Sequence, residues 1–264
     1  MEQINSLQNT KIKNLVKLQK SSERKEQKRF LVEGFKEIQL AHEAGYKIEM
    51  LFWCPILGIE ESKISKLNSN NNIYKISQEI FAKIAYREGS DGVMAVFYMQ
   101  NILLENIKLS KKPLIIILES VEKPGNLGAV LRTADAVHAD AVLICDPRTD
   151  IFNPNVIRSS IGCVFTNQVV SCTNVEALNW LKKHNIKSYA AALVKGALNY
   201  HKINYNEPTA FIMGTESDGL SDFWLQNAST RIVIPMLGKI DSLNVSVSTA
   251  VLAFEVVRQR GIEK

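Results

Sequence analysis

The segment IPMLGKIDSLNVSVSTAVLAFEVVRQR, residues 234–260, says more about the fold than any other part of the chain. Its first half is a loop of small and polar residues. Its second half spaces apolar residues at a period near 3.6, which predicts a helix that ends before Gly261. Ser242, Asn244 and Ser246 place hydroxyl and amide groups, with free backbone N–H donors, around the start of that helix. Such a pattern fits either a capped helix or one wall of a ligand site, and the segment alone does not separate the two.

Two further loops of the same character lie upstream, each directly after an apolar run typical of a buried strand. Residues 119–129 follow the strand predicted at 114–118, and residues 214–221 follow the strand predicted at 210–213. The third loop follows a strand at 231–234. Three passages from strand to loop to helix predict one ligand crevice at the carboxyl ends of a parallel sheet.

These three loops, in this order, resemble the motifs of the SpoU (TrmH-like) branch of the SPOUT RNA methyltransferases. The matching residues are Asn126-Leu127-Gly128-Ala129 with Arg132, Gly214-Thr215-Glu216 with Gly219-Leu220, and Ile234-Pro235-Met236 with Ser242-Leu243-Asn244-Val245-Ser246. The stretch RFLVEG at 29–34 also resembles the entry to the family's substrate-binding domain. The resemblance implies transfer of a methyl group from S-adenosylmethionine to a ribose 2′-hydroxyl of RNA.

The resemblance also implies a fold that the residues alone do not reveal. We expect an α/β protein in which residues 106–264 form a trefoil-knotted SPOUT methyltransferase domain with a mostly parallel sheet. Residues 1–105 would form a small α/β domain, similar to a ribosomal protein, that binds the RNA substrate. Knots are rare exceptions among folds, so the knot, and a homodimer packed through it, are expected from the resemblance only.

The resemblance assigns catalytic roles to five residues. Arg132 would orient or activate the 2′-hydroxyl, with Asn126 beside it, while Glu216 and Asn244 organise the site and Ser246 hydrogen-bonds the nucleotide. An arginine stays protonated at any working pH and is a poor general base. We therefore prefer a role for Arg132 in binding the adjacent phosphate and stabilising charge on the oxygen, with the proton leaving to phosphate or water. A surface salt bridge for Arg132 and a helix cap for Glu216 are the alternatives.

Five further residues are expected to bind the cofactor. Gly214 lacks a Cβ atom and would let the backbone approach the ligand. Ile234 and Leu243 match the family positions that enclose the adenine, although both could equally pack in the core. Leu193, at the end of its predicted strand, would cover the cofactor, and Met236 belongs to the third motif.

Charge is concentrated at the start of the chain. Residues 1–30 carry eight basic and only three acidic side chains, so this segment accounts for the whole net charge of +5. A basic arm and helix suit a nucleic-acid backbone, because cations there displace the counterions of the phosphates. A solvated, lysine-rich helix face is the alternative.

The sequence lacks the patterns of membrane, secreted and metal-binding proteins. No run approaches 18 apolar residues and the first ten residues are polar, so we expect neither a membrane span nor a secretory signal, and a cytoplasmic protein. The four cysteines, Cys54, Cys145, Cys163 and Cys172, show no metal-ligand spacing and are expected to be reduced structural thiols. The four histidines are not clustered, so no metal is expected.

The remaining sequence alternates strands and helices around a polar loop at 62–72 and a linker at 102–112. Helices are predicted at 11–22, 35–44, 78–86 and 175–184, and strands at 30–32, 50–53, 73–76, 93–97, 141–145, 165–170 and 187–193.

The main hypothesis is an RNA 2′-O-methyltransferase. The resemblance makes structured ribosomal RNA a better candidate substrate than transfer RNA, because family members with a two-domain build and a basic N-terminal helix usually act on it. The alternative is a non-catalytic RNA-binding ribosome assembly factor that retains the fold. Asn126, Arg132, Glu216 and Asn244 are all present, which argues against it. A nucleotide-binding enzyme is disfavoured because the chain has neither the P-loop Gly-Lys-Ser/Thr nor Gly-x-Gly-x-x-Gly.

Overall fold

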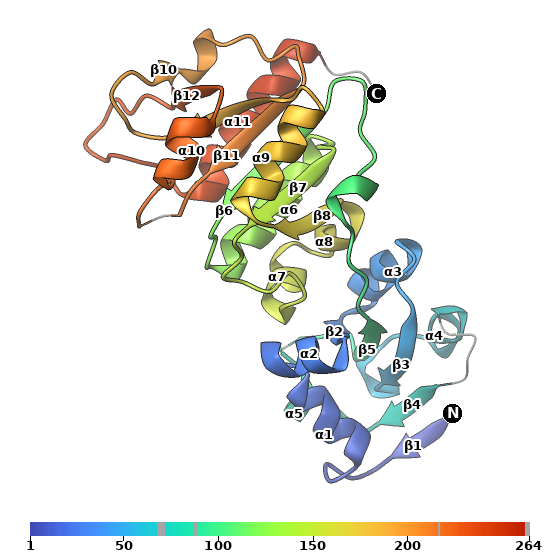
Figure 1. Cartoon of the computed structure of the whole chain (residues 1–264). Helices are drawn as coiled ribbons and strands as arrows, with labels where there is room; N and C mark the ends of the chain where they lie inside the picture. Colours follow the sequence, from blue (N-terminus) through green and yellow to red (C-terminus); the bar gives the residue numbers. More distant parts are fainter. Residues whose placement is uncertain (68–71, 87–88, 216, 262–264) are drawn as a thin grey trace. The chain divides into compact units, whose positions relative to one another are not determined.

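The computed structural model describes residues 1–67, 72–86, 89–215 and 217–261 (Figure 1). The chain forms two compact units. Unit 1 contains Met1–Gln100 and Asp150–Thr166, and unit 2 contains Asn101–Thr149 and Asn167–Lys264. Each unit therefore takes residues from more than one stretch of the chain.

Unit 1 is built on a mixed five-stranded sheet in the order β1-β4-β3-β5-β2. Strand β5 runs antiparallel to β2 and β3, whereas β4 runs parallel to β1 and β3. The strands are β1 (Glu2–Ile4), β2 (Arg29–Glu33), β3 (Ile48–Trp53), β4 (Ile73–Ile76) and β5 (Val93–Tyr98). The α-helices are α1 (Thr10–Lys17), α2 (Ser21–Gln27), α3 (Phe35–Glu43), α4 (Glu61–Leu67), α5 (Gln78–Ile84), α7 (Pro154–Ser159) and α8 (Cys163–Thr166).

Helices cover both faces of this sheet because its strands alternate buried side chains between them. Helices α1 and α5 pack on the face that carries Leu31 and Phe52. On the other face, the ring of Phe30 stacks on Phe152 with ring centroids 4.3 Å apart and lies 5.9 Å from Phe165. The segment 150–166 thus completes the core of unit 1.

Unit 2 holds a seven-stranded sheet in the order β10-β12-β9-β11-β6-β7-β8, and every strand pair described in it is parallel. This confirms the expected α/β fold with a mostly parallel sheet. The strands are β6 (Leu114–Glu119), β7 (Ala141–Cys145), β8 (Val169–Cys172), β9 (Lys187–Ala191), β10 (Leu198–Asn199), β11 (Thr209–Met213) and β12 (Thr230–Val233). The helices are α6 (Pro124–Ala136), α9 (Asn174–Lys183), α10 (Asp222–Asn227) and α11 (Val245–Arg260).

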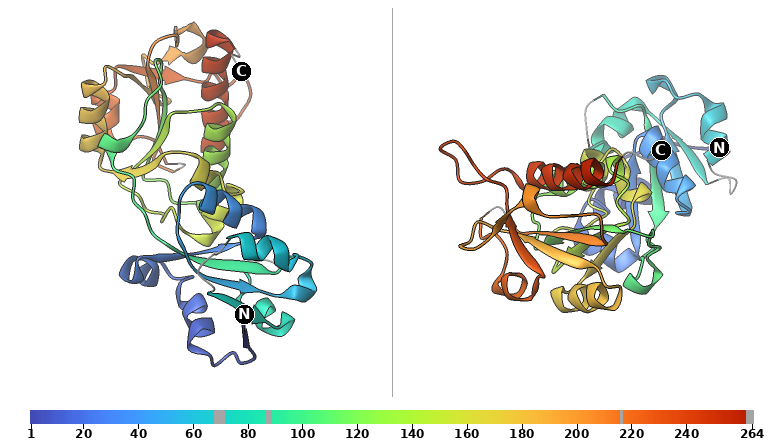
Figure 2. Two further views of the ribbon diagram at one scale, coloured as in Figure 1. Left: turned by 90° about the vertical axis from the view of Figure 1, so that its right-hand side faces the viewer. Right: turned by 90° about the horizontal axis from the view of Figure 1, so that it is seen from above.

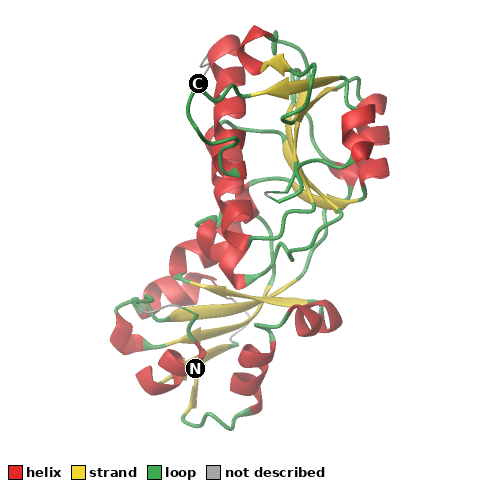
Figure 3. Ribbon diagram, turned by 90° about the vertical axis from the view of Figure 1, so that its left-hand side faces the viewer, coloured by secondary structure: helices red, strands yellow, loops and turns green. Residues whose placement is uncertain are grey.

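The sheet of unit 2 lies between two helical layers (Figures 2 and 3). Helices α6 and α11 pack together on one face, and α9 and α10 cover the other. Every residue of β6, β7 and β11 is buried. Their unbroken apolar runs follow from this, because a parallel strand covered on both faces has no solvent side. All three sequence loops therefore leave the same edge of one sheet.

Three predicted elements differ from the structure. The strand predicted at 165–170 is wrong in its first half, because Cys163–Thr166 form a helix and the strand begins only at Val169. A run of β-branched and aromatic residues favours a strand, but packing against Phe30 decides the local structure here. The polar loop predicted at 62–72 is wrong up to Leu67, because α4 buries Ile64 and Leu67 three residues apart; residues 68–71 lie outside the described residues.

The helix predicted at 11–22 is in fact two helices. Helix α1 ends at Lys17, and α2 begins at Ser21. The break is stabilised by Arg24, whose Nη1 donates to the carbonyl oxygens of Leu18 and Gln19 at 2.9 and 2.7 Å. A helix leaves its last carbonyls without partners, and a buried guanidinium supplies them here.

Candidate active site

A cavity of about 610 Å³ opens at the carboxyl ends of β9, β11 and β12, beside the first turn of α11. We call it the larger cavity. It is lined by residues that end the three strands, by the loop after β11 and by the loop between β12 and α11. Its volume lies within the range of about 300–1,000 Å³ that is usual for ligand sites.

The five residues predicted to bind a cofactor all line the larger cavity. Leu193 follows β9, Gly214 follows β11, and Ile234, Met236 and Leu243 belong to the loop between β12 and α11. The parallel register explains this convergence, because β9, β11 and β12 are direct neighbours or next neighbours in the sheet. Residues that are far apart in sequence therefore meet at one edge.

Gly214 is required by its own loop, which we call the 214–220 loop. Thr215 and Gly219 form a short backbone bridge with N–H to O distances of 3.0 and 3.2 Å. A Cβ atom on Gly214 would lie 2.1 Å from the carbonyl oxygen of Gly219, which is closer than Cβ atoms approach backbone. The absence of a side chain thus allows the loop to fold back on itself, a reason that the sequence did not reveal.

Asn244 joins two of the sequence loops. It is the N-cap of α11, and its Oδ1 accepts hydrogen bonds from the backbone N–H and the Oγ of Ser246 at 2.9 and 2.7 Å. Its Nδ2 donates to Oδ1 of Asn126 at 3.2 Å. The side chain therefore both caps the helix and links α11 to the loop that begins α6.

A smaller cavity of about 310 Å³ adjoins the larger one. It is lined on one side by Val121, Glu122, Lys123 and Asn126, from the loop after β6 and the start of α6. The two cavities share lining residues, namely Gly214, Thr215, Ser217 and Val245. One loop and the start of α11 thus line both adjoining spaces.

Three predicted catalytic residues are not among the described residues that line either cavity. Ser246 lies in the first turn of α11 and hydrogen-bonds Asn244. Arg132 lies on α6 one turn beyond Gly128, is exposed, and is not among the described residues that line either cavity. Glu216 lies outside the described residues. By contrast, Asp218, Asp241 and Ser248 line the larger cavity, and only their nearness to the quoted motifs could have indicated them.

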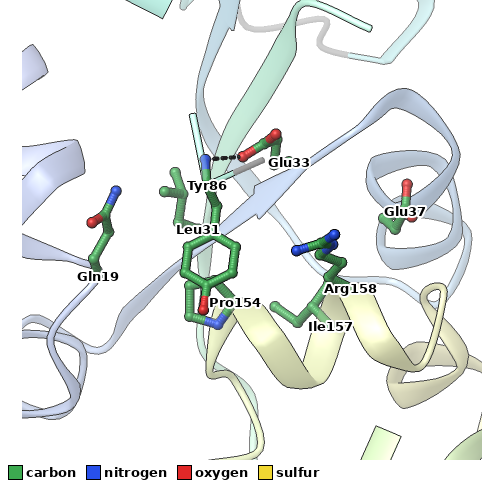
Figure 4. A pocket seen from close by; sticks show the side chains of 8 residues that line it. All are labelled: Gln19, Leu31, Glu33, Glu37, Tyr86, Pro154, Ile157 and Arg158. Atoms are coloured by element: carbon green, nitrogen blue, oxygen red, sulfur yellow. Dashed lines mark hydrogen bonds between the residues drawn. The ribbon is translucent and has the colours of Figure 1, made fainter. Parts of the chain in front are cut away.

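Unit 1 has a hollow of its own, lined by residues that include Leu31, Tyr86, Pro154 and Arg158 (Figure 4). At its edge, the backbone N–H of Tyr86 donates to Oε2 of Glu33 at 2.6 Å. The hollow has a volume of about 20 Å³, which is room for about one water molecule. It is far too small for a nucleotide or a cofactor.

The described residues contain no group of three His, Cys, Asp or Glu side chains that could hold a metal ion. All four cysteines are free thiols. Cys145 and Cys172 lie on neighbouring strands with their Sγ atoms 3.8 Å apart. The hydrogen bond with Cys172, together with burial, raises the pKa of the Cys145 thiol, which favours its neutral form. Within the same described ranges, no helix is long and apolar enough to cross a membrane.

Both parts of the chain match families of known proteins. Residues 113–254, more than half of the chain, match the SpoU rRNA Methylase family, and residues 9–95 match the MRM3-like substrate binding domain. The 23S rRNA (guanosine(2553)-2′-O)-methyltransferase RlmP of Bacillus subtilis strain 168 is 32% identical over 257 residues, covering 97% of this chain and 99% of that protein.

Two solved structures are similar to this chain over nearly its whole length. The crystal structure of an RNA 2′-O ribose methyltransferase is 38% identical, with a TM-score of 0.82, and the match covers 98% of this chain and 99% of that one. The AdoMet-bound rRNA methyltransferase of Sinorhizobium meliloti is 26% identical, with a TM-score of 0.89 and 97% of each chain covered. The protein is therefore an S-adenosylmethionine-dependent RNA methyltransferase. The chain belongs to the SpoU rRNA methylase family.

Proposed function

We propose that the protein transfers a methyl group from S-adenosylmethionine to a ribose 2′-hydroxyl of structured RNA, and that this RNA is ribosomal rather than transfer RNA. The observation that carries the proposal is the pair of adjoining cavities at the carboxyl edge of the parallel sheet. Similarity to a 23S rRNA 2′-O-methyltransferase along nearly the whole of both chains supports the choice of RNA.

The larger cavity would hold S-adenosylmethionine, which supplies an activated methyl group when bound. Ile234, Met236 and Leu243 would enclose the adenine with apolar surface, Leu193 would cover it, and the backbone beyond Gly214 would form the wall toward the smaller cavity. Apolar walls with a few polar groups suit a nucleoside.

The smaller cavity would hold the ribose. The 2′-hydroxyl would accept there the methyl group that bound S-adenosylmethionine supplies, and its proton would be released to a phosphate or to water. Asn126, fixed by its hydrogen bond from Asn244, would orient the ribose, and Ser246 would hydrogen-bond the nucleotide. Arg132 would bind the neighbouring phosphate and stabilise negative charge on the attacking oxygen, since a guanidinium donates but does not accept protons. Glu216 would organise the loop between the two substrates.

Residues 1–105 would form the RNA substrate-binding domain, and residues 106–264 the methyltransferase domain. Helix α1 supports this role: it buries Ile12 and Leu15 while Lys13 and Lys17 are exposed, with Lys20 exposed just beyond it. Exposed cations of this kind contact phosphates without regard to sequence.

The catalytic unit would contain the trefoil knot of SPOUT proteins and form a homodimer through it. Exposed Val247 and Phe254 on α11 offer apolar surface for a second copy. An enzyme that modifies ribosomal RNA in this way would act in the cytoplasm.

The test is transfer of tritium from labelled S-adenosylmethionine to total RNA from a strain that lacks the gene. We expect Arg132→Ala to lower kcat by about 10²–10³, the usual cost of removing one group that stabilises developing charge. Arg231→Ala, an exposed arginine of the same unit, is the matched control and should transfer normally. S-adenosylhomocysteine should raise the melting temperature of all three proteins, while ATP and NAD should not.

Full activity of Arg132→Ala would remove Arg132 from the mechanism. If the wild-type protein bound S-adenosylhomocysteine but labelled no RNA, the non-catalytic assembly factor would become the better explanation.

A further inference from the structure

Glu119 is a buried carboxylate that the proposed mechanism does not use. It is the last residue of β6 and is 4% exposed. Its Oε2 accepts a hydrogen bond from the backbone N–H of Ser221 at 2.8 Å. Its Oε1 accepts hydrogen bonds from the Oγ of Ser221 at 2.6 Å and from the Nδ2 of Asn174 at 2.7 Å. All three hydrogen bonds are donated to the side-chain oxygens of Glu119, which thus hold Ser221 and Asn174.

The partners of Glu119 continue into a partly buried network. Asn174 is the first residue of α9, and its Oδ1 accepts the indole N–H of Trp224 at 2.6 Å. Trp224 is fully buried in α10, and Ser221 is the N-cap residue of that helix. One carboxylate at the end of β6 thus fixes the starts of two helices on the same face of the sheet.

The same contacts fix both ends of the 214–220 loop on one strand. Met213, just before the loop, pairs with Leu118 in the parallel ladder of β11 and β6. Ser221, just after the loop, binds Glu119, the next residue along β6. Between these two anchors, the loop supplies residues to the walls of both cavities. A shift of Ser221 would therefore move the wall that the two cavities share.

We propose that Glu119 is a positioning residue for S-adenosylmethionine: by holding Ser221, it sets the position of the 214–220 loop against the cofactor. It touches neither substrate and acts only through the loop. The inference rests on the proposed placement of the cofactor in the larger cavity.

The decisive variant is Glu119→Gln. It keeps the size of the side chain, but its amide nitrogen cannot accept the hydrogen bonds that one carboxylate oxygen now receives. We expect KM and Kd for S-adenosylmethionine to rise about ten-fold, or ~1.4 kcal/mol. KM for RNA should rise by a smaller factor, because residues of the same loop also line the smaller cavity. Ser221→Ala, which removes one of the two contacts with Ser221, should change the same quantities in the same direction by a smaller factor. Glu119→Asp keeps the charge, and should recover part of the lost affinity.

Asp140→Asn is the matched control for stability. Asp140 accepts the backbone N–H groups of Ser110 and Leu114 at 2.5 and 2.9 Å, at the amino end of β6, on the opposite edge of the sheet from the cavities. Its loss should lower the melting temperature without changing either KM. If Glu119→Gln behaved like Asp140→Asn, with a lower melting temperature and an unchanged Kd for S-adenosylmethionine, Glu119 would be structural only.

Calorimetric titration with S-adenosylmethionine separates this proposal from the proposed function. It measures the effect of Glu119→Gln on cofactor affinity even if no RNA is methylated. An unchanged Kd in both Glu119→Gln and Ser221→Ala would overturn the positioning role while leaving the methyltransferase activity untouched.

Discussion

Asp150→Asn should destabilise unit 1 strongly, because it breaks an ion pair that is buried in the core of that unit. Arg24 is 1% exposed, and its Nε and Nη2 both lie 2.7 Å from Oδ2 of Asp150, whose side chain is 12% exposed. The asparagine could accept one of these hydrogen bonds but would leave the guanidinium without a neighbouring negative charge. Breaking a buried pair by removing one partner costs about 3–5 kcal/mol.

The lower end of that range applies here. Asp150 retains some contact with solvent, and the carbonyl oxygens of Leu18 and Gln19 continue to accept from Arg24. A loss of about 3 kcal/mol in a protein of this size lowers the melting temperature by roughly 6–12 °C. Scanning calorimetry and urea unfolding followed by circular dichroism measure the loss directly.

Glu49→Gln is the matched control in the same unit. Glu49 pairs with Arg29 at 2.8 Å, but both side chains are about a quarter exposed. A solvent-exposed pair contributes only about 0.2–1 kcal/mol, so this variant should melt within about 4 °C of the wild type. If Asp150→Asn were no less stable than Glu49→Gln, the assignment of the 150–166 segment to the core of unit 1 would lose its energetic basis.

Two further predictions concern unit 2. Gly214→Ala places a Cβ atom 2.1 Å from the carbonyl oxygen of Gly219, so we expect calorimetry to show at least about a ten-fold loss of S-adenosylmethionine affinity (~1.4 kcal/mol). Gly125→Ala is the control, because its Cβ would meet nothing within 4 Å, and it should bind S-adenosylmethionine normally. Equal affinities in the two variants would refute the steric argument. The hydrogen bonds from Arg258 hold the pKa of Glu255 below its ordinary value of 4.5. The folded state therefore gains stability above pH 4.5 and loses it as the pH falls through the lowered pKa, so the excess stability of wild type over Glu255→Gln in urea should shrink between pH 6 and pH 3. A difference in unfolding free energy between wild type and Glu255→Gln that stays constant from pH 6 to pH 3 would contradict this role of the Arg258–Glu255 pair.

The sequence was informative about the active site because the loops that form it follow apolar runs typical of buried strands. The apolar runs before Glu119 and Gly214 leave little choice but a buried parallel strand, and the carboxyl ends of parallel strands meet at one edge. The residues expected to contact the cofactor could therefore be placed together without any knowledge of distances. Their individual roles stay predictions, since lining a cavity does not establish contact with a ligand.

Contacts between segments that are distant in sequence were beyond the reach of sequence patterns. Glu119 binds partners 55 and 102 residues away. In the sequence, a glutamate at the end of a predicted strand indicates only the first residue of a loop. The packing of Phe152 and Phe165 on Phe30 has no periodic signature either. Local patterns specify which residues are buried, whereas the choice of partner is made only when the elements pack.

The position of the methyl group on RNA tests the central claim most directly. Labelled RNA from the transfer reaction would be hydrolysed in alkali and its products separated by size. The account predicts tritium in a single alkali-resistant dinucleotide from ribosomal RNA, because a methylated 2′-oxygen cannot attack the adjacent phosphate. Label recovered only in mononucleotides would show methylation of a base and would contradict the account.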